Sequence, residues 1–309
     1  MKQAGKMLRL FVTMLCMLAL LAGTALAAST NSGVDWEGAT IQAEGAGVAP
    51  ATARSAAQAR IMARRAALVD AYRQLAEQVK GVQIDATTTV EQAAVTNDTV
   101  NMKVSAFIQG ARIVSEKQLN DGTYTVTLQA PLYGVTGSLA SVVMPQTTAR
   151  AEFPAPVATV EPAAPVQLPV TERPQVDESQ LPTTTPIYGH ASSASSAPDG
   201  RAIGGFTGLI VDCRGLGLTP VMSPTIENAA GEPIYGYKNL DYDLIVKNGM
   251  AGYAKTTAQA KRAGSNPLVV KAIRVDGGSP VLSTADANRV LIENGATGFL
   301  DTASVVFLR

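Results

Sequence analysis

The chain has 309 residues, and its 25 Lys and Arg balance 25 Asp and Glu, so the formal net charge at pH 7 is zero. A near-neutral chain lacks the basic surplus that drives general binding to nucleic acid or anionic lipid, and no nucleic-acid partner is expected. The only histidine, His190, lies in low-complexity sequence. Its position excludes histidine-containing catalytic triads and histidine-ligated metal sites from the folded regions.

Residues 1–27 have the features of a secretory signal peptide. A basic start precedes an apolar run at residues 10–21, and an Ala-x-Ala cleavage signature ends at Ala27. The run is shorter than the roughly 18–20 residues that span a bilayer, so cleavage is expected, with an uncleaved anchor as the alternative. Cys16 lies inside this run and not at the cleavage point, so no lipid is expected on it. The mature protein is then exported, periplasmic or associated with the outer membrane, with no transmembrane segment.

Residues 28–143 are predicted to form the first folded domain. A strand is expected at residues 39–44, then a turn at Gly45 and Gly47, then an alanine-rich helix over residues 51–79 with Pro50 at its start. Large apolar side chains at helical spacing predict the buried face of this helix: Ile61, Leu68, Tyr72, Leu75 and Val79.

The remainder of this domain contains sequence signals for a second helix and a β-hairpin. Asn97 is a good N-cap for a second helix that ends at Gly110. The Asp121-Gly122 pair between β-prone runs at residues 111–119 and 123–132 predicts a hairpin. The order of elements predicts an α+β domain of two layers, with helices on one face of a mainly antiparallel sheet.

Residues 144–200 contain ten of the 17 prolines, together with many Ala, Thr and Ser residues. This composition predicts a semi-extended linker, such as joins domains that act apart. Residues 201–309 are predicted to form a second small domain of the α/β or α+β class. It should contain strands at residues 207–213, 243–246 and 268–275, a helix at residues 251–263, and a helix at residues 283–294 capped by Ser283 and closed by Gly295. Each folded region is large enough for a core of its own.

The glycines of the first turn raise the question of a cofactor. A strand, Gly45-x-Gly47 and a helix resemble the start of a dinucleotide-binding site. Pro50 stands where a third small residue is needed, however, and the nearest acidic residue at a strand end, Asp85, lies roughly 40 residues after Gly45 and not about 20. A tight turn is the simpler interpretation, with free helix-start amides as a possible anion site. No cofactor is expected.

A family resemblance covers roughly residues 36–133. It is carried by the run from Trp36 to Gly47, by Ala49-Pro50, and by the alanine and arginine pattern that leads to Leu75. This stretch resembles the twenty-kilodalton membrane-associated lipoprotein antigens and the N-terminal domain of flagellar assembly protein T. The resemblance implies an envelope domain without known catalytic residues. The chain departs from it in two ways: no lipidation cysteine stands at the cleavage site, and the C-terminal region does not match the rest of the flagellar protein.

Two further groups of residues contain side chains that could take part in catalysis or ligand binding. Asp212 and Arg214 flank Cys213 at a strand end, which could hold a reactive thiolate beside a guanidinium, although a buried or interchain cysteine is the simpler reading without a histidine. Asp241 and Asp243 alternate along a predicted strand, so both carboxylates could face one side as an acid–base or cation pair. A solvated strand edge would give the same spacing.

These observations favour a non-enzymatic envelope protein with a structural or assembly role. The expected partners are envelope or appendage proteins, bound through the N-terminal domain, and peripheral association with the outer membrane is compatible with the sequence. The alternative is a periplasmic ligand-binding module that takes a cell-wall fragment or a small anion at residues 214–224. A carboxylate-dependent hydrolase that uses Asp241 and Asp243 is the third hypothesis. No catalytic, cofactor-binding or metal-ligating residue is assigned.

Overall fold

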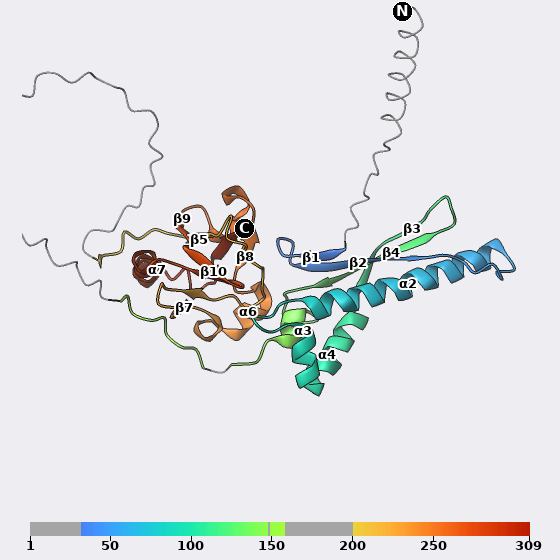
Figure 1. Ribbon diagram of the computed structural model, residues 1–309, viewed down its shortest axis with the longest axis horizontal. Helices are drawn as coiled ribbons and strands as arrows, with labels where there is room; N and C mark the ends of the chain where they lie inside the picture. Colours follow the sequence, from blue (N-terminus) through green and yellow to red (C-terminus); the bar gives the residue numbers. More distant parts are fainter. Residues whose placement is uncertain (1–31, 148, 158–199) are drawn as a thin grey trace, which may run out of the picture.

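The computed structural model describes residues 32–147, 149–157 and 200–309 (Figure 1). The predicted signal peptide, Cys16, His190 and residues 158–199 of the predicted linker lie outside the described residues.

The N-terminal domain has the predicted two layers. Its antiparallel sheet has the strand order β1-β2-β4-β3, built from β1 (Gly33–Asp35), β2 (Thr40–Gly47), β4 (Tyr124–Pro131) and β3 (Arg112–Gln118). The long helix α2 (Ala56–Gly81) lies along one face of this sheet (Figure 1). Three shorter helices complete the domain, namely α3 (Val90–Thr96), α4 (Asp98–Gln109) and α5 (Leu139–Val143). The α+β prediction for this region is confirmed.

The packing of α2 on the sheet corrects the prediction for residues 39–79. Gly45 and Gly47 lie within β2 and not in a turn. A Cβ atom on Gly45 would lie 2.1 Å from the backbone nitrogen of Ala71, and one on Gly47 would lie 2.3 Å from that of Ala67. The backbones of strand and helix are therefore in direct contact, which no larger side chain would allow.

The buried face and the first residue of α2 also differ from the prediction. Leu75 and Val79 are buried as predicted, and Leu68 and Tyr72 are half-buried against the core, but Ile61 is 54% exposed. The fully buried face consists of residues at intervals of four: Ala63, Ala67, Ala71, Leu75 and Val79. The helix begins after Ser55, whose hydroxyl accepts a hydrogen bond from the Gln58 amide, rather than at Pro50. Small side chains at the contact, not the largest apolar ones, determine which face is covered.

Local capping signals were more reliable than the apolar pattern. Asn97 caps α4 by accepting from the amides of Thr99 and Val100, as predicted, and the predicted hairpin is the β3–β4 pair. A capping box between Thr89 and Gln92 starts α3, a helix that was not predicted.

The C-terminal domain contains two four-stranded sheets. The first is entirely parallel, with the strand order β8-β12-β5-β9, and is formed by β8 (Gly252–Ala254), β12 (Val305–Leu308), β5 (Gly208–Asp212) and β9 (Pro267–Lys271). The second has the order β10-β11-β6-β7 and is formed by β10 (Arg274–Asp276), β11 (Ser279–Val281), β6 (Ile226–Glu227) and β7 (Pro233–Tyr235).

The helical segments of this domain differ from the prediction at three places. Residues 243–246 belong to helix α6 (Tyr242–Asn248) and not to a strand. The predicted helix at residues 251–263 is β8 followed by two 3₁₀ turns, η3 (Thr257–Gln259) and η4 (Lys261–Ala263). Helix α7 (Thr284–Thr297) is capped by Ser283 as predicted, but it ends at the left-handed Gly298 and not at Gly295. A further 3₁₀ turn, η2 (Tyr237–Asn239), precedes α6.

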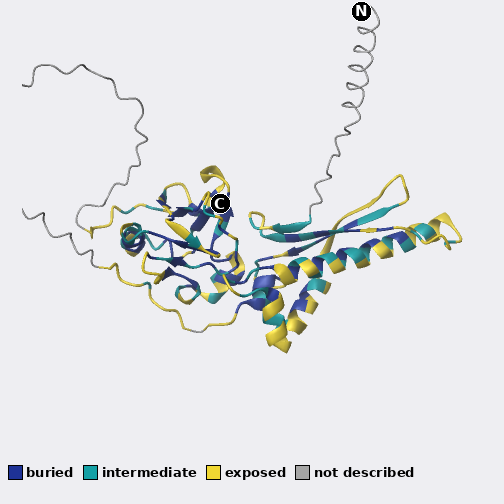
Figure 2. Cartoon of the chain, in the orientation of Figure 1, coloured by how far each residue is buried: buried dark blue, intermediate teal, exposed yellow. Residues whose placement is uncertain are grey.

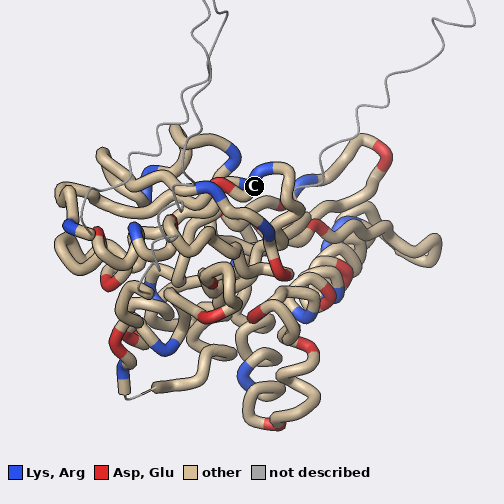
Figure 3. The backbone as a smooth tube through the Cα atoms, turned by 60° about the vertical axis from the view of Figure 1, so that its left-hand side comes forward, with Lys and Arg blue, Asp and Glu red and all other residues tan. Residues whose placement is uncertain are grey.

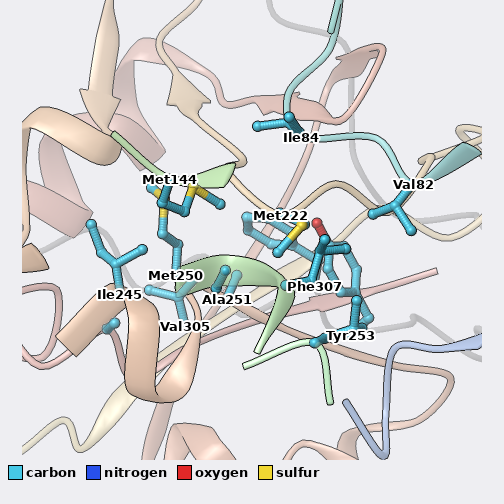
Figure 4. Close-up of a cluster of buried hydrophobic side chains, with 14 of the residues drawn as sticks. Val82, Ile84, Met144, Met222, Ile245, Met250, Ala251, Tyr253, Val305 and Phe307 are labelled. Carbon is cyan, nitrogen blue, oxygen red and sulfur yellow. The ribbon is translucent and has the colours of Figure 1, made fainter. Parts of the chain in front are cut away.

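The two domains share one hydrophobic core, which differs from the expectation of two separate cores. Val82, Ile84 and Met144 of the N-terminal region lie among buried residues of the C-terminal domain, including Met222 and Phe307 (Figure 4). Burial continues through the junction between the domains (Figure 2). Apolar side chains at the base of the N-terminal domain are covered only because the C-terminal domain packs on them.

Backbone hydrogen bonds cross the same junction. The amide of Met222 donates to the Gln83 carbonyl at 3.0 Å, and that of Ser223 donates to the Ile84 carbonyl at 2.7 Å. At the other side, the amide of Gly134 donates to the Val246 carbonyl at 2.8 Å. Separation of the domains would exchange these hydrogen bonds for bonds to water, at a net cost of about 0.5–1.5 kcal/mol each.

The described residues on either side of residues 158–199 are held against α7. The side-chain amide of Asn288 accepts from the backbone N–H of Val157 at 2.8 Å and donates to its carbonyl at 2.7 Å. The buried carboxylate of Glu293 accepts from the amides of Ile203 and Gly204 at 2.9 and 2.8 Å. Residues 149–157 were predicted as linker, yet they pack on the C-terminal domain, where Val157 bonds to α7 and the Ala151 amide donates to the Lys238 carbonyl at 2.7 Å.

The strand–helix contact predicts the effect of a single methyl group. Gly45→Ala should lower the free energy of unfolding by about 1–3 kcal/mol, because the backbone of α2 must move to admit the Cβ atom. Urea unfolding followed by circular dichroism measures this change. The matched control is Gly81→Ala, since a Cβ atom there meets nothing within 4 Å; it should leave stability unchanged or raise it by up to about 1 kcal/mol. Equal stability of the two variants would contradict the packing described.

Candidate functional site

The predicted site residues lie at three separate places, and the structure brings only Asp212 and Arg214 together. Gly45 and Gly47 are occupied by their contact with α2, so no space remains there for a phosphate group. The start of α2 is Ala56, several residues beyond these glycines. The geometry of a dinucleotide-binding turn is therefore absent from this region.

Asp241 and Asp243 do not form a pair of facing carboxylates. Asp241 is the N-cap of α6 and accepts hydrogen bonds from the amides of Asp243 at 2.9 Å and Leu244 at 3.1 Å. Residues two apart on a helix do not face each other, so the expected strand-like alignment is wrong. Within residues 32–147, 149–157 and 200–309, no group of three or more His, Cys, Asp or Glu residues could hold a metal ion.

Basic side chains cluster at the carboxyl edge of the parallel sheet. Lys255 follows β8, Arg309 follows β12, and Lys271 ends β9. Hydrogen bonds continue the strand register at this edge: the Arg309 amide donates to Ala254 at 3.0 Å, and the Cys213 amide donates to Leu308 at 2.9 Å. In open α/β sheets, this is the edge at which ligands bind.

Asp212 and Arg214 bond to each other at this edge. The Arg214 guanidinium donates from Nε to Oδ1 of Asp212 at 2.9 Å and from a terminal nitrogen to Oδ2 at 2.6 Å. The guanidinium lowers the pKa of the Asp212 carboxyl, against the opposing effect of partial burial. The pair is therefore ionised and largely neutralises itself.

Cys213 is a buried free thiol and not a nucleophile. It is 1% exposed, and its Sγ–H donates to the Val211 carbonyl at 3.7 Å. Burial, together with the negative charge of Asp212, raises the pKa of Cys213 to about 12. The thiolate needed for attack on an electrophile is not formed at neutral pH.

A cavity of about 400 Å³ opens beside this edge. It is lined by Lys255 and Arg309 from the strand ends, by Cys213 and Leu218, and by the loop glycines Gly215 and Gly217. The sequence pointed to this loop through its glycines and through Arg214. It gave no sign of Lys255 and Arg309, because only the parallel strand order places these distant residues side by side.

A second cavity, of about 440 Å³, lies at the junction of the domains. Its lining includes Trp36 and Tyr133 from the N-terminal region and Tyr253 and Arg262 from the C-terminal domain. The rings of Trp36 and Tyr253 meet edge to face at 5.5 Å. Gly249, with φ +73°, leaves room for Tyr133, whose ring lies 2.6 Å from the position of an added Cβ atom.

The cation in the junction cavity already has structural partners. Arg262 donates to the carbonyls of Asn248 and Ala303, both at 2.7 Å, and to that of Gly249 at 2.5 Å. It therefore closes the end of α6, where carbonyls lack helical partners, and it holds Ala303 in a left-handed conformation with φ +52°. Burial lowers the pKa of Arg262.

The burial of Cys213 predicts low thiol reactivity. In the folded protein, alkylation by iodoacetamide at pH 8 should be at least tenfold slower than in urea-unfolded protein, because folding both shields the thiol and keeps it protonated. Mass spectrometry of timed samples measures the rate. Equal rates in the folded and unfolded protein would contradict the burial of this group.

The raised pKa of Cys213 also predicts how stability depends on pH. The contribution of this thiol to the free energy of unfolding should be fully present below about pH 9 and should decrease as the pH rises toward 12, because the thiol of the unfolded chain ionises first.

Comparison with known families gives one match for each domain. Residues 35–130 match the LPP20 lipoprotein family. Residues 208–309 match the second domain of Treponema pallidum Tp0624. None of the curated proteins matches the sequence. Neither family match concerns flagellar assembly protein T.

These matches bear on where the protein acts. The match of residues 35–130 to a lipoprotein family indicates an exported, envelope-associated protein. In the part of the chain that the structure describes, none of the helices combines the length and apolar character needed to cross a bilayer. The N-terminal domain is thus similar to the LPP20 lipoprotein family, and the chain joins it to a domain similar to the second domain of Tp0624.

Proposed function

We propose that this protein is a non-catalytic component of the cell envelope that binds another envelope protein through its N-terminal domain. The observation that carries the proposal is the exposed edge strand β3. All seven of its residues are exposed, and it forms the end of the sheet, paired only with β4. A strand with a free edge can accept a strand from a partner, which then extends the sheet.

The position of β3 favours access by a partner. Figure 1 shows the β3–β4 hairpin reaching away from the C-terminal domain, beside the start of α2. Ile113 and Val114 are 42% and 50% exposed, so an arriving strand would find apolar side chains as well as backbone groups. The backbone hydrogen bonds would supply affinity, and the side-chain contacts would supply selectivity.

Other features of the strand favour a specific partner over general aggregation. The register shifts between Ile113 and Ser115, so Val114 forms a bulge, and Lys117 adds a charge. Bulges and lysines on an edge discourage pairing with strands of arbitrary shape. Glu116 is held by Arg64 of α2, whose Nε donates to its Oε2 at 2.9 Å, which fixes the strand on the domain.

The charges on the rest of the domain agree with a protein partner rather than nucleic acid. Basic and acidic residues are interleaved along α2 (Figure 3), and Arg73 pairs with both Asp70 and Glu77. Because carboxylates neutralise Arg64 and Arg73, the helix offers no continuous basic track for phosphates. Action in the periplasm or at the outer membrane, and a role in appendage assembly, would be particular forms of the proposed function.

The cavity at the carboxyl edge of the parallel sheet favours a second function for the C-terminal domain. Its position and lining fit the binding of a small ligand, either a cell-wall fragment or a small anion. This function and protein binding by β3 use different domains, so one chain can perform both.

Substitution of Val114 tests the protein-binding proposal. Immobilised Val114→Glu protein should retain at least tenfold less of the envelope protein that the unaltered chain retains from an envelope extract, because the added charge would be desolvated at the β3 edge. The retained protein, once purified, should slow hydrogen exchange of the β3 amides.

Val269→Glu is the matched control, since Val269 is 55% exposed on β9, an edge strand of the other domain. Its binding should equal that of the unaltered chain. Three outcomes would reject the proposal: equal losses for the two variants, protection away from β3, or retention of no envelope protein.

A further inference from the structure

We propose that the carboxyl edge of the parallel sheet binds the phosphate group of a small phosphorylated ligand. The inference rests on the ligand-binding function proposed for the C-terminal domain, and it specifies the residues and the chemical class of the ligand. Lys255, Arg309 and the loop from Gly215 to Leu218 form the site, which we call the phosphate cradle.

The two cations of the cradle come from neighbouring strands. Lys255 follows β8 and Arg309 follows β12, and adjacent strands lie about 4.8 Å apart. Both residues line the same cavity. Among the ion pairs formed by the described residues, none includes either side chain. Their charges therefore remain available to an anion.

Charge elsewhere along this edge does not cancel them. The Asp212 carboxylate is already bonded to Arg214, and Lys271 adds a further positive charge that lowers the pKa of Asp212. Basic groups remain in excess even if an α-carboxylate at Arg309 is counted. The Cys213 thiol at the cavity wall is protonated, so it contributes no negative charge.

The glycine loop supplies backbone donors to the same cavity. Gly215 and Gly217 have φ angles of +79° and +72°, whereas Leu216 between them is not left-handed. When left-handed and right-handed backbone conformations alternate in this way, successive amide groups point toward one side and form a concave anion-binding site. Within the described residues, the amides of Gly217 and Leu218 donate to no acceptor. A Cβ atom on either glycine would meet nothing within 4 Å, so backbone conformation and not crowding requires glycine here.

The size of the cavity indicates more than a bare phosphate ion. At about 400 Å³, it falls in the lower part of the roughly 300–1,000 Å³ range of ligand sites. Leu218 offers an apolar contact to the remainder of the ligand. A phosphorylated glycerol or monosaccharide has the matching size, whether it is free or forms a lipid headgroup. The junction cavity is a weaker anion site, since Arg262 is already committed to three carbonyls.

Titration of the mature chain with glycerol 3-phosphate tests the proposal. Isothermal calorimetry should detect binding that weakens as salt is added, and nuclear magnetic resonance should show shifted amide signals for Gly217 and Leu218. Lys255→Gln and Arg309→Gln should each weaken binding at least tenfold. Lys247→Gln, on the exposed surface of α6, should leave the affinity unchanged. Vesicles that contain phosphatidylglycerol form a second arm and show whether a lipid headgroup is also accepted.

Each other outcome would overturn the inference. Equal binding of glycerol and glycerol 3-phosphate, or unaltered binding by both cradle variants, would reject phosphate recognition while leaving a ligand-binding function in place. If phosphate, glycerol 3-phosphate, neutral sugars and vesicles all fail to bind up to millimolar concentration, both phosphate recognition and the ligand-binding function are rejected. Protein binding by β3 would be unaffected by any of these results, because it is measured with variants in the other domain.

Discussion

The shared apolar core between the two domains is the contact on which the rest of the structure depends. Val82 and Ile84 follow the end of α2 and pack in a cluster with Met222 and Phe307 (Figure 4). Amides of the C-terminal domain donate to carbonyls of the same N-terminal segment. Separation would expose apolar side chains to water and exchange these hydrogen bonds for bonds to water, and both effects oppose it. The orientation of one domain on the other is therefore set by packing.

This fixed orientation has a functional consequence. The β3 edge and the phosphate cradle belong to different domains, and the common core holds them at a constant separation. The described residues on either side of residues 158–199 are bonded to the same helix, through Asn288 and Glu293. Both of these described flanks are therefore held on the C-terminal domain. If both proposed sites are occupied, the common core would hold the partner strand and the phosphorylated ligand in a fixed relation to each other.

The sequence predicted the features that depend on neighbouring residues. Asn97 and Ser283 were recognisable as caps, and Asp121-Gly122 as a turn, because each acts on amides or dihedral angles a few residues away. The covered face of α2 was not predictable in this way. Ala63, Ala67 and Ala71 are buried because the glycines of β2 let the helix approach, a partnership between distant segments. Similarly, Asp212 and Arg214 were found at their strand end, whereas Lys255 and Arg309 meet only through the order of the parallel strands.

Hydrogen exchange at the amides that cross the junction tests the common core most directly. Met222, Ser223 and Gly134 each donate to a carbonyl of the other domain. In the intact mature chain, these amides should exchange as slowly as those of β5, the buried strand of the parallel sheet, because both would open only when the whole molecule unfolds. Fast exchange at all three positions, with β5 still protected, would show that the domains separate while folded and would contradict the account.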